Sequence, residues 1–197
     1  MKLIAITPEV TQKHELEFIM AILDSGFSYV HLRKPSFSID ELRQYLSSVP
    51  TEYHSRLKLH SHFELAAEFA VGGVHLNHRF PSVPSSIPTA GMSISRSCHS
   101  FAELKDAKSY HYAFLSPIFD SISKPGYESR FSCVELQRFF RSNPLCNNIV
   151  ALGGVTPEHL HTLKISGLAG AAFLGYLFNA ADTAELKTRL LRIKSNL

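Results

Sequence analysis

Eight short apolar segments recur along the chain, and most of them are separated by stretches with helical periodicity. This alternation is typical of a parallel α/β fold, because buried parallel strands read as apolar runs and helices connect them. The predicted strands are Leu3–Thr7, Tyr29–Arg33, Leu57–His60, Gly73–Leu76, Met92–Ser95, Tyr112–Ser116, Ile149–Leu152 and Gly170–Leu174. Eight such units predict a (β/α)8 TIM barrel in which residues 1–197 form a single domain.

The connections between these strands are not all alike. Amphipathic helices are predicted at Glu15–Leu23 and Asp182–Lys194, where apolar residues recur at helical spacing. Residues 80–88 contain three prolines, so we expect the fourth crossover helix to be degenerate. Residues 120–130 form a long polar connection after the sixth strand, at the barrel end where active sites lie. We therefore expect this loop to be functional.

The last two predicted strands lead into glycines. Gly153 and Gly154 follow the seventh strand, and Gly175, followed by Tyr176, comes directly after the eighth. Glycine lets main-chain N–H groups approach a ligand, and the start of the next helix favours an anion. Because these two loops are neighbours in a barrel, they predict a phosphate site. Glycines that end strands for steric reasons alone are the competing interpretation.

Histidines gather at or just after strands two to five: His31, His60, His62, His75, His78 and His99. Imidazole exchanges protons near neutral pH, so these residues are suited to acid and base catalysis. His75 lies inside a strand and is also consistent with a packed structural role. Neither His60-Ser61-His62 nor the segment from His75 to His78 has a carboxylate or cysteine at ligand spacing, so we expect no metal site.

Basic residues from several loops are predicted to face the same barrel end. Arg33, Arg96 and Lys124 follow or lie close to strands two, five and six, and they suit the binding of phosphate or carboxylate groups. Lys34, which precedes Pro35, is expected to lie on the solvated surface.

Charge and composition exclude several classes of partner. The net charge of +3 and the absence of a basic run argue against nucleic acid. No apolar stretch is long enough for a membrane span, and the apolar start of the chain is too short for a signal peptide. The three cysteines lack metal spacing and fit reduced thiols, so we expect a cytoplasmic protein.

The chain resembles the thiamine phosphate synthase family, which also contains thiazole tautomerases. The segments that carry the resemblance are Val30–Arg33, Glu64–Ala66 with Gly73–Leu76, Ser95–Ser100, Ser116–Phe119 with Ser123-Lys124, and Val150–Gly154. The resemblance implies a TIM barrel, a homodimer, and a thiazole phosphate bound by the loops after strands seven and eight. Ser97, Ser121 and Ser123 join the glycines as expected substrate-binding residues, and Lys124 is expected to close over the site.

The resemblance leaves two reactions open. A synthase of this family joins a pyrimidine pyrophosphate to the thiazole phosphate and uses magnesium, which needs carboxylate ligands. The expected aspartate positions here read His60-Ser61 and Asn77–Phe80, so magnesium would depend on Glu64 or Asp120. In addition, Pro35 replaces a basic residue that the family uses to bind pyrophosphate. These departures favour a thiazole tautomerase, which transfers a proton and needs no cofactor. Because Pro117 matches the synthases, the acid or base would be His31, His78 or His99.

The sequence leaves three alternatives to the tautomerase open. The first is the thiamine phosphate synthase, with magnesium as its cofactor. The second is a barrel that has lost catalysis and only binds a phosphorylated ligand. The third is another phosphosugar enzyme on the same fold, such as an epimerase or isomerase.

Overall fold

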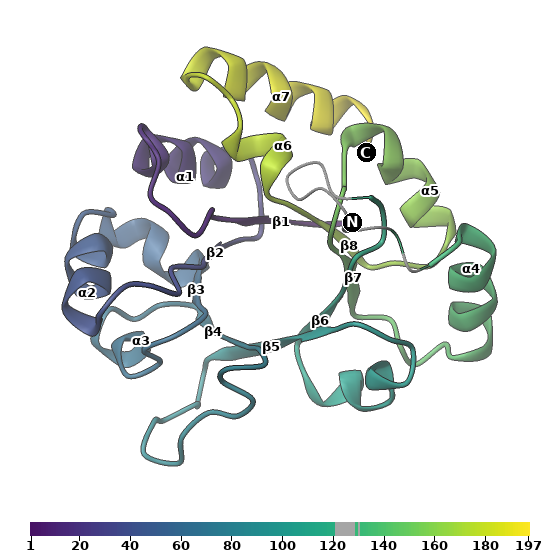
Figure 1. Ribbon diagram of the computed structural model, residues 1–197, viewed down its shortest axis with the longest axis horizontal. Coiled ribbons are helices and arrows are strands. Elements are labelled where there is room, and N and C mark those ends of the chain that lie inside the picture. The colour runs from purple at the N-terminus through teal and green to yellow at the C-terminus, as the bar shows by residue number, and fades with distance from the viewer. Residues whose placement is uncertain (121–128, 130) are drawn as a thin grey trace.

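The eight predicted strands form a closed parallel barrel in the computed structural model, which describes residues 1–120, 129 and 131–197 (Figure 1). The strands are β1 (Lys2–Ile6), β2 (Tyr29–Leu32), β3 (Leu57–Leu59), β4 (Gly73–Leu76), β5 (Ser93–Cys98), β6 (Tyr112–Leu115), β7 (Ile149–Ala151) and β8 (Gly170–Phe173). Each strand pairs with the next, and β8 pairs with β1. The predicted (β/α)8 fold is therefore confirmed.

Helices surround the barrel on its outer side (Figure 1). The α-helices are α1 (Glu15–Asp24), α2 (Ile39–Ser47), α3 (Leu65–Glu68), α4 (Cys133–Ser142), α5 (Leu160–Ile165), α6 (Gly175–Phe178) and α7 (Thr183–Ser195). Three further turns are 3₁₀ helices: η1 (Thr51–Arg56), η2 (Glu103–Ser109) and η3 (Pro157–His159). Residues 77–92, between β4 and β5, contain no helix, so the expected degenerate fourth crossover is also confirmed.

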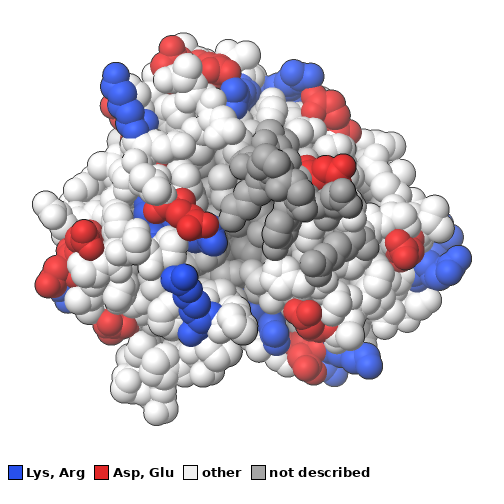
Figure 2. Space-filling view, in the orientation of Figure 1, with Lys and Arg blue, Asp and Glu red and all other residues white. Residues whose placement is uncertain are grey.

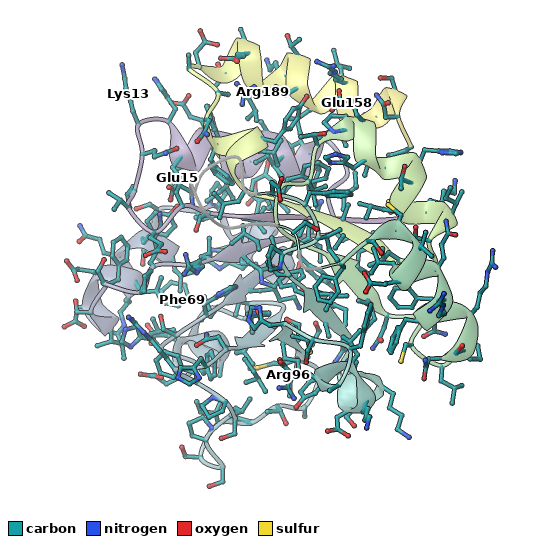
Figure 3. The ribbon with its side chains drawn as sticks, turned by 45° about the vertical axis from the view of Figure 1, so that its right-hand side comes forward. Lys13, Glu15, Phe69, Arg96, Glu158 and Arg189 are labelled. Atoms are coloured by element: carbon teal, nitrogen blue, oxygen red, sulfur yellow. The ribbon has the colours of Figure 1, made fainter. Side chains whose placement is uncertain are left out.

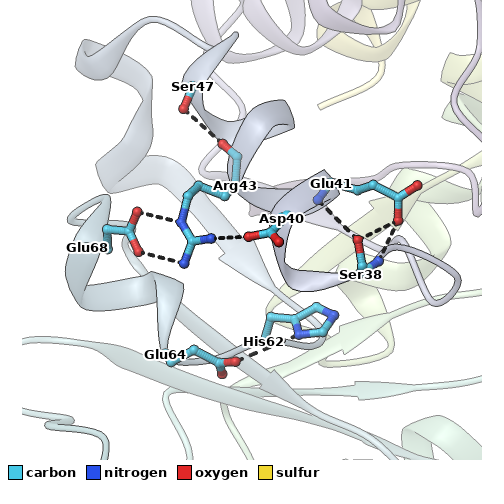
Figure 4. Close-up of polar contacts among 8 residues, drawn as sticks. All are labelled: Ser38, Asp40, Glu41, Arg43, Ser47, His62, Glu64 and Glu68. Carbon is cyan, nitrogen blue, oxygen red and sulfur yellow. Dashed lines mark hydrogen bonds and ion pairs between the residues drawn. The ribbon is translucent and has the colours of Figure 1, made fainter.

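Local capping explains where two of the helices begin. Ser38 accepts a hydrogen bond from the Glu41 N–H, while the Glu41 carboxylate accepts one from the Ser38 N–H (Figure 4). Such a capping box satisfies N–H groups that have no partner inside the helix. Ser132 and Glu135 form the same arrangement at the start of α4. Arg43 then joins α2 to α3 through an ion pair with Glu68.

The interior of the barrel is divided into an apolar and a polar half. Side chains from β1, β6, β7 and β8 form a small apolar cluster inside the barrel: Ile4, Ile6, Tyr112, Phe114, Val150 and Ala172. On β2 to β5 the buried inner positions are instead polar: His31, Lys58, His75 and Ser95. The larger apolar core lies between the barrel and its helices. Polar groups inside a barrel require internal hydrogen bonds, and His31 and His75 have such bonds to His60 and Ser95.

Lys34 differs from its sequence-based expectation, because it lies inside the protein rather than on the surface. Its side chain is fully buried, and its Nζ lies 2.7 Å from Glu15 Oε1. It also donates a hydrogen bond to the carbonyl of Pro8, while Tyr45 donates to Glu15. The salt bridge anchors the loop after β2 on α1, because a buried charge requires a partner.

The surface carries mixed charges. On the face shown in Figure 2, Lys and Arg side chains are interspersed with Asp and Glu around the edge of the molecule. No helix among the described residues combines the length and apolar character needed to span a bilayer.

Candidate active site

A cavity of about 500 Å³ occupies the carboxyl end of the barrel, where residues at or after the ends of all eight strands line it. Its position follows from the fold, because the carboxyl ends of parallel strands meet at one end of a closed barrel. The loops after the strands can therefore place different chemical groups around one ligand. The site has a histidine floor, a glycine-rich wall and a rim with two arginines.

The floor is made by His60 and His75, which line the cavity together with Phe114. His60 Nε2 lies 2.9 Å from Nδ1 of His31, which is completely buried beneath the floor. His31 Nε2 lies 2.6 Å from the hydroxyl of Tyr112. The imidazoles and the phenol thus form a hydrogen-bonded chain that runs from the cavity across the interior of the barrel to β6.

These three histidines are neutral at physiological pH. Burial, with a smaller contribution from Arg33, lowers the pKa of His75 to about 3. Burial, followed by the neighbouring histidines, also holds the pKa values of His31 and His60 well below the ordinary value. A neutral imidazole has one N–H and one free lone pair, so each ring can donate one hydrogen bond and accept one.

The wall after β7 and β8 is built from main chain. Gly153 and Gly154 have φ values of 95° and 62°, which glycine adopts without strain. A Cβ on Gly154 would lie 2.2 Å from the carbonyl oxygen of Asp120, so the close approach of the two loops also requires glycine. Among the described residues, the N–H groups of Gly154, Gly175 and Tyr176 donate to no protein acceptor. These groups can therefore bind an anion in the cavity.

Two arginines also line the cavity. Arg79 follows β4, which lies across the ring from β8, whereas Arg33 follows β2, which only β1 separates from β8. Arg33 Nη1 lies 2.5 Å from Glu9 Oε1, and its side chain is 37% exposed. The cavity therefore offers two kinds of anion-binding group, main-chain N–H groups after β7 and β8 and guanidinium groups after β2 and β4. It is suited to a ligand, or a pair of ligands, with negative charge at both ends.

His99 lies at the edge of the cavity in a defined tautomer. Its Nδ1 lies 3.0 Å from the carbonyl oxygen of Ser116, which can only accept a hydrogen bond. The Nδ1 atom therefore carries the proton, and in the neutral ring Nε2 is the free base. Of the described histidines that line the cavity, His99 thus has an orientation that suits proton transfer.

The described part of the cavity does not fit magnesium. Glu9 is the acidic residue among its described lining residues, and it is paired with Arg33. Glu64 lies near His62 instead, at 3.8 Å (Figure 4), and Asp120 accepts a hydrogen bond from the Ser129 N–H. Magnesium is held mainly by carboxylate oxygens and water, so this donor set does not make a site for it.

Comparison with known proteins now places the chain in a family. A family model described as thiamine monophosphate synthase matches residues 3–177, which is most of the sequence. The chain belongs to the thiamine monophosphate synthase family. This membership confirms the family to which the five sequence segments pointed.

Individual members of the thiamine monophosphate synthase family are similar over nearly the whole chain. A thiamine-phosphate synthase from Halorhodospira halophila is 30% identical over 183 residues, covering 89% of this chain and 86% of that protein. One from Photorhabdus laumondii is 26% identical over 183 residues, covering 89% and 84%. The structure of a thiamine phosphate pyrophosphorylase from Bacteroides thetaiotaomicron has a TM-score of 0.86 at 32% identity, covering 100% of this chain and 97% of that one.

Most of the described residues that the sequence pointed to lie around this cavity. The predicted residues that line it are Arg33, His78, Ser97, His99, Gly153, Gly154, Gly175 and Tyr176. Ser121, Ser123 and Lys124 lie outside the described residues, so their predicted roles stay predictions. The structure differs from expectation for His31 and Arg96.

Arg96 does not line the cavity, which corrects its expected role in binding the ligand. Strand β5 continues to Cys98, so Arg96 is part of the strand and not of the loop after it. Side chains alternate along a strand, and Ser95 and Ser97 take the inner positions. Arg96 therefore points outward and lies over the ring of Tyr110, near η2 (Figure 3).

His31 does not line the cavity either, because its ring is completely buried below His60 and His75. It cannot contact a ligand directly, and any effect on chemistry must pass through His60. This corrects the expectation that His31 is a proton shuttle in contact with the substrate.

Arg79 and Phe114 also line the cavity, and the sequence had not indicated a binding role for either residue. Asn77 Oδ1 accepts hydrogen bonds from the N–H groups of Arg79 and Phe80, at 3.0 and 3.2 Å. This turn folds the chain back after β4 and brings Arg79 to the cavity. An asparagine directly after a predicted strand was the available signal for this turn. Phe114 gave no such signal, since an inward-facing aromatic residue reads as core.

Proposed function

We propose that the protein is a thiamine phosphate synthase that joins a pyrimidine pyrophosphate to a thiazole phosphate. The observation that supports it most is the pair of anion-binding sides in one cavity. The N–H groups of Gly154, Gly175 and Tyr176 would hold the thiazole phosphate, and Arg33 and Arg79 would hold the pyrophosphate. The names of the similar proteins support the same reaction.

The residues of this chain suggest how they would act in that reaction. The uncharged imidazoles of His60 and His75 and the ring of Phe114 would lie beneath the heterocycles without repelling them. As pyrophosphate leaves, negative charge grows on it, and the two guanidinium groups would stabilise that charge. Magnesium would supply further charge neutralisation in a synthase, but the described residues do not form a site for it.

A thiazole tautomerase is the second candidate, and the carboxylate-poor lining of the described cavity favours it. In this reaction Arg33 or Arg79 would bind the carboxylate of the thiazole. His99 Nε2, whose ring is oriented by the Ser116 carbonyl, would take or give the proton. The reaction needs no cofactor. His78, which also lines the cavity and is exposed, is the alternative acid or base.

The two reactions are separated by a direct assay. Purified full-length protein is incubated with the pyrimidine pyrophosphate and the thiazole phosphate, with and without magnesium, and separately with the carboxylated thiazole phosphate. We expect thiamine phosphate from the first mixture and no aromatised product from the second. Aromatisation without thiamine phosphate formation would contradict the synthase and establish the tautomerase. Binding of the thiazole phosphate with neither product would indicate a non-catalytic binding protein.

Variants test whether the proposed residues act in the assay. Arg79→Gln should lower kcat/KM by about 10- to 100-fold, because a charge-assisted contact to the leaving group is lost. Arg138→Gln is the matched control, since Arg138 is exposed on α4 and does not line the cavity. Equal rates for the two variants would contradict the role of Arg79.

The expected cytoplasmic location and homodimer stay predictions. Cys98, Cys133 and Cys146 are free thiols, which suits a reducing compartment.

A further inference from the structure

Three histidines from neighbouring strands converge inside the barrel. His31 lies on β2, His60 directly follows β3, and His75 lies on β4. One nitrogen from each ring lies within 4.8 Å of the corresponding nitrogens of the other two. These residues lie on or after three different strands, so their spacing along the sequence matches no local metal-binding motif. The pairing of the parallel strands brings them together.

We propose that His31, His60 and His75 form a Zn²⁺ site at the floor of the cavity, with the fourth coordination position open to the ligand. Three imidazole ligands and one open position are a recurring zinc arrangement. With Zn–N distances near 2.0–2.1 Å, three imidazoles in tetrahedral positions have ring centroids about 5 Å apart. The observed centroid distances are 5.1 Å for His31 to His60 and 5.1 Å for His31 to His75, close to this value. The rings of His60 and His75 are stacked at 4.3 Å with an angle of 26°, so one of these two rings would turn when the ion binds.

The hydrogen-bond partners of these rings fit such a site. Tyr112 contacts Nε2 of His31 at 2.6 Å, which leaves Nδ1 on the side of His60. Ser95 contacts Nδ1 of His75 at 2.9 Å. The Nε2 of His75 lies 2.9 Å from the Ser97 hydroxyl, which a metal would displace. A metal-bound histidine usually donates its other N–H to a neighbouring acceptor, which fixes the orientation of the ring. Tyr112 and Ser95 would have that role.

The chemistry of the three ligands favours Zn²⁺ over Mg²⁺ and Ca²⁺. The rings are buried and uncharged, so they can bind a cation without a net loss of protons. The proton between His31 Nδ1 and His60 Nε2 would first move to the other nitrogen of its ring. None of the three ligands is a carboxylate, so the site does not suit Mg²⁺ or Ca²⁺. Imidazole nitrogen suits Zn²⁺. His60 and His75 line the cavity, so a water molecule or a ligand atom there could complete the tetrahedron.

The test is a metal titration of the full-length chain without an affinity tag, after removal of bound metal with EDTA. Isothermal titration with Zn²⁺ should show one equivalent bound with a Kd of about 1 µM or tighter. Co²⁺ should give the strong visible bands of a four-coordinate ion. Absence of saturable Zn²⁺ binding, or a Co²⁺ spectrum of the hydrated ion, would overturn the proposal, and neither result depends on a variant that folds.

Variants locate the site within the chain. His60→Gln should weaken Zn²⁺ binding by more than about 100-fold, because the loss of a ligand exceeds the 10- to 100-fold effect of losing a residue that orients one. Tyr112→Phe, which removes only the hydroxyl, should weaken binding by about 10- to 100-fold. His161→Gln is the control, since His161 is exposed and outside the cluster. Unchanged affinity in His60→Gln would overturn the assignment, whereas the proposed function is tested separately by product formation.

Discussion

Lys58 shows how a single residue inside the barrel connects burial to stability. Its side chain is fully buried on β3, where its Nζ donates hydrogen bonds to the Gly72 carbonyl and the Ser93 hydroxyl and lies 4.0 Å from the centroid of the Tyr29 ring. Burial, with a smaller contribution from Lys2, lowers its pKa to about 7. The folded protein therefore favours the neutral amine, whereas the unfolded chain keeps the ordinary pKa of 10.5.

This pKa difference predicts a pH dependence of stability. Between about pH 7 and pH 10.5 the unfolded chain binds more protons at Lys58 than the folded one, so Lys58 makes the free energy of unfolding rise with pH. Relative to that of Lys58→Met, the free energy of unfolding of the wild-type protein should increase by at most about 1.4 kcal/mol per pH unit in this window. Urea denaturation at several pH values measures it. The exposed residue Lys105, changed to Met, is the control. Parallel wild-type and Lys58→Met curves would show that burial does not affect this amine.

At the scale of elements, the turn after β7 determines whether the cavity can hold an anion. Gly154 has a positive φ and lies against the chain at Asp120, so a side chain there would be both strained and obstructed. Gly154→Ala should therefore weaken binding of the thiazole phosphate by at least about 10-fold, since a displaced turn moves the N–H groups away from the phosphate. Calorimetry of the variant measures this effect.

The control for that variant is Gly91→Ala. Gly91 also has a positive φ, of 79°, but a Cβ there would meet nothing within 4 Å. The control carries similar backbone strain without the collision and lies outside the cavity. A Gly154→Ala variant that binds as tightly as Gly91→Ala would contradict the role of this turn.

The elements also show what the sequence could and could not reveal. The strands were predictable because buried parallel strands are continuous apolar runs, and closure of the barrel then places the residues after them at one end. The sequence did not show whether a side chain lies inside the barrel, at its mouth or on its outer side, because that depends on the residue at which each strand ends. The predicted fifth strand stopped at Ser95 and left Arg96 in a loop, whereas β5 reaches Cys98 and turns Arg96 outward.

The histidine cluster illustrates the same difficulty. His31, His60 and His75 are far apart in sequence, and their convergence requires the register between β2, β3 and β4. A search for local ligand spacing could not find them. His31 precedes the last residue of β2 and faces inward, so it lies below the cavity instead of at its rim.

At the scale of the whole molecule, the barrel brings two anion-binding sides and a neutral histidine floor around one cavity. The glycine loops after β7 and β8 meet Arg33 and Arg79 around one mouth because the ring of eight strands closes. The proposed function depends mainly on the binding of a phosphate by main-chain N–H groups after the last two strands.

The most direct test of that claim compares two ligands that differ only in the phosphate. Calorimetry would measure the Kd of the thiazole phosphate and of the corresponding thiazole alcohol for the same full-length protein. Charge-assisted hydrogen bonds to three N–H groups predict that the phosphate compound binds at least about 100-fold more tightly. Equal affinity for the two compounds would contradict a phosphate site in the cavity.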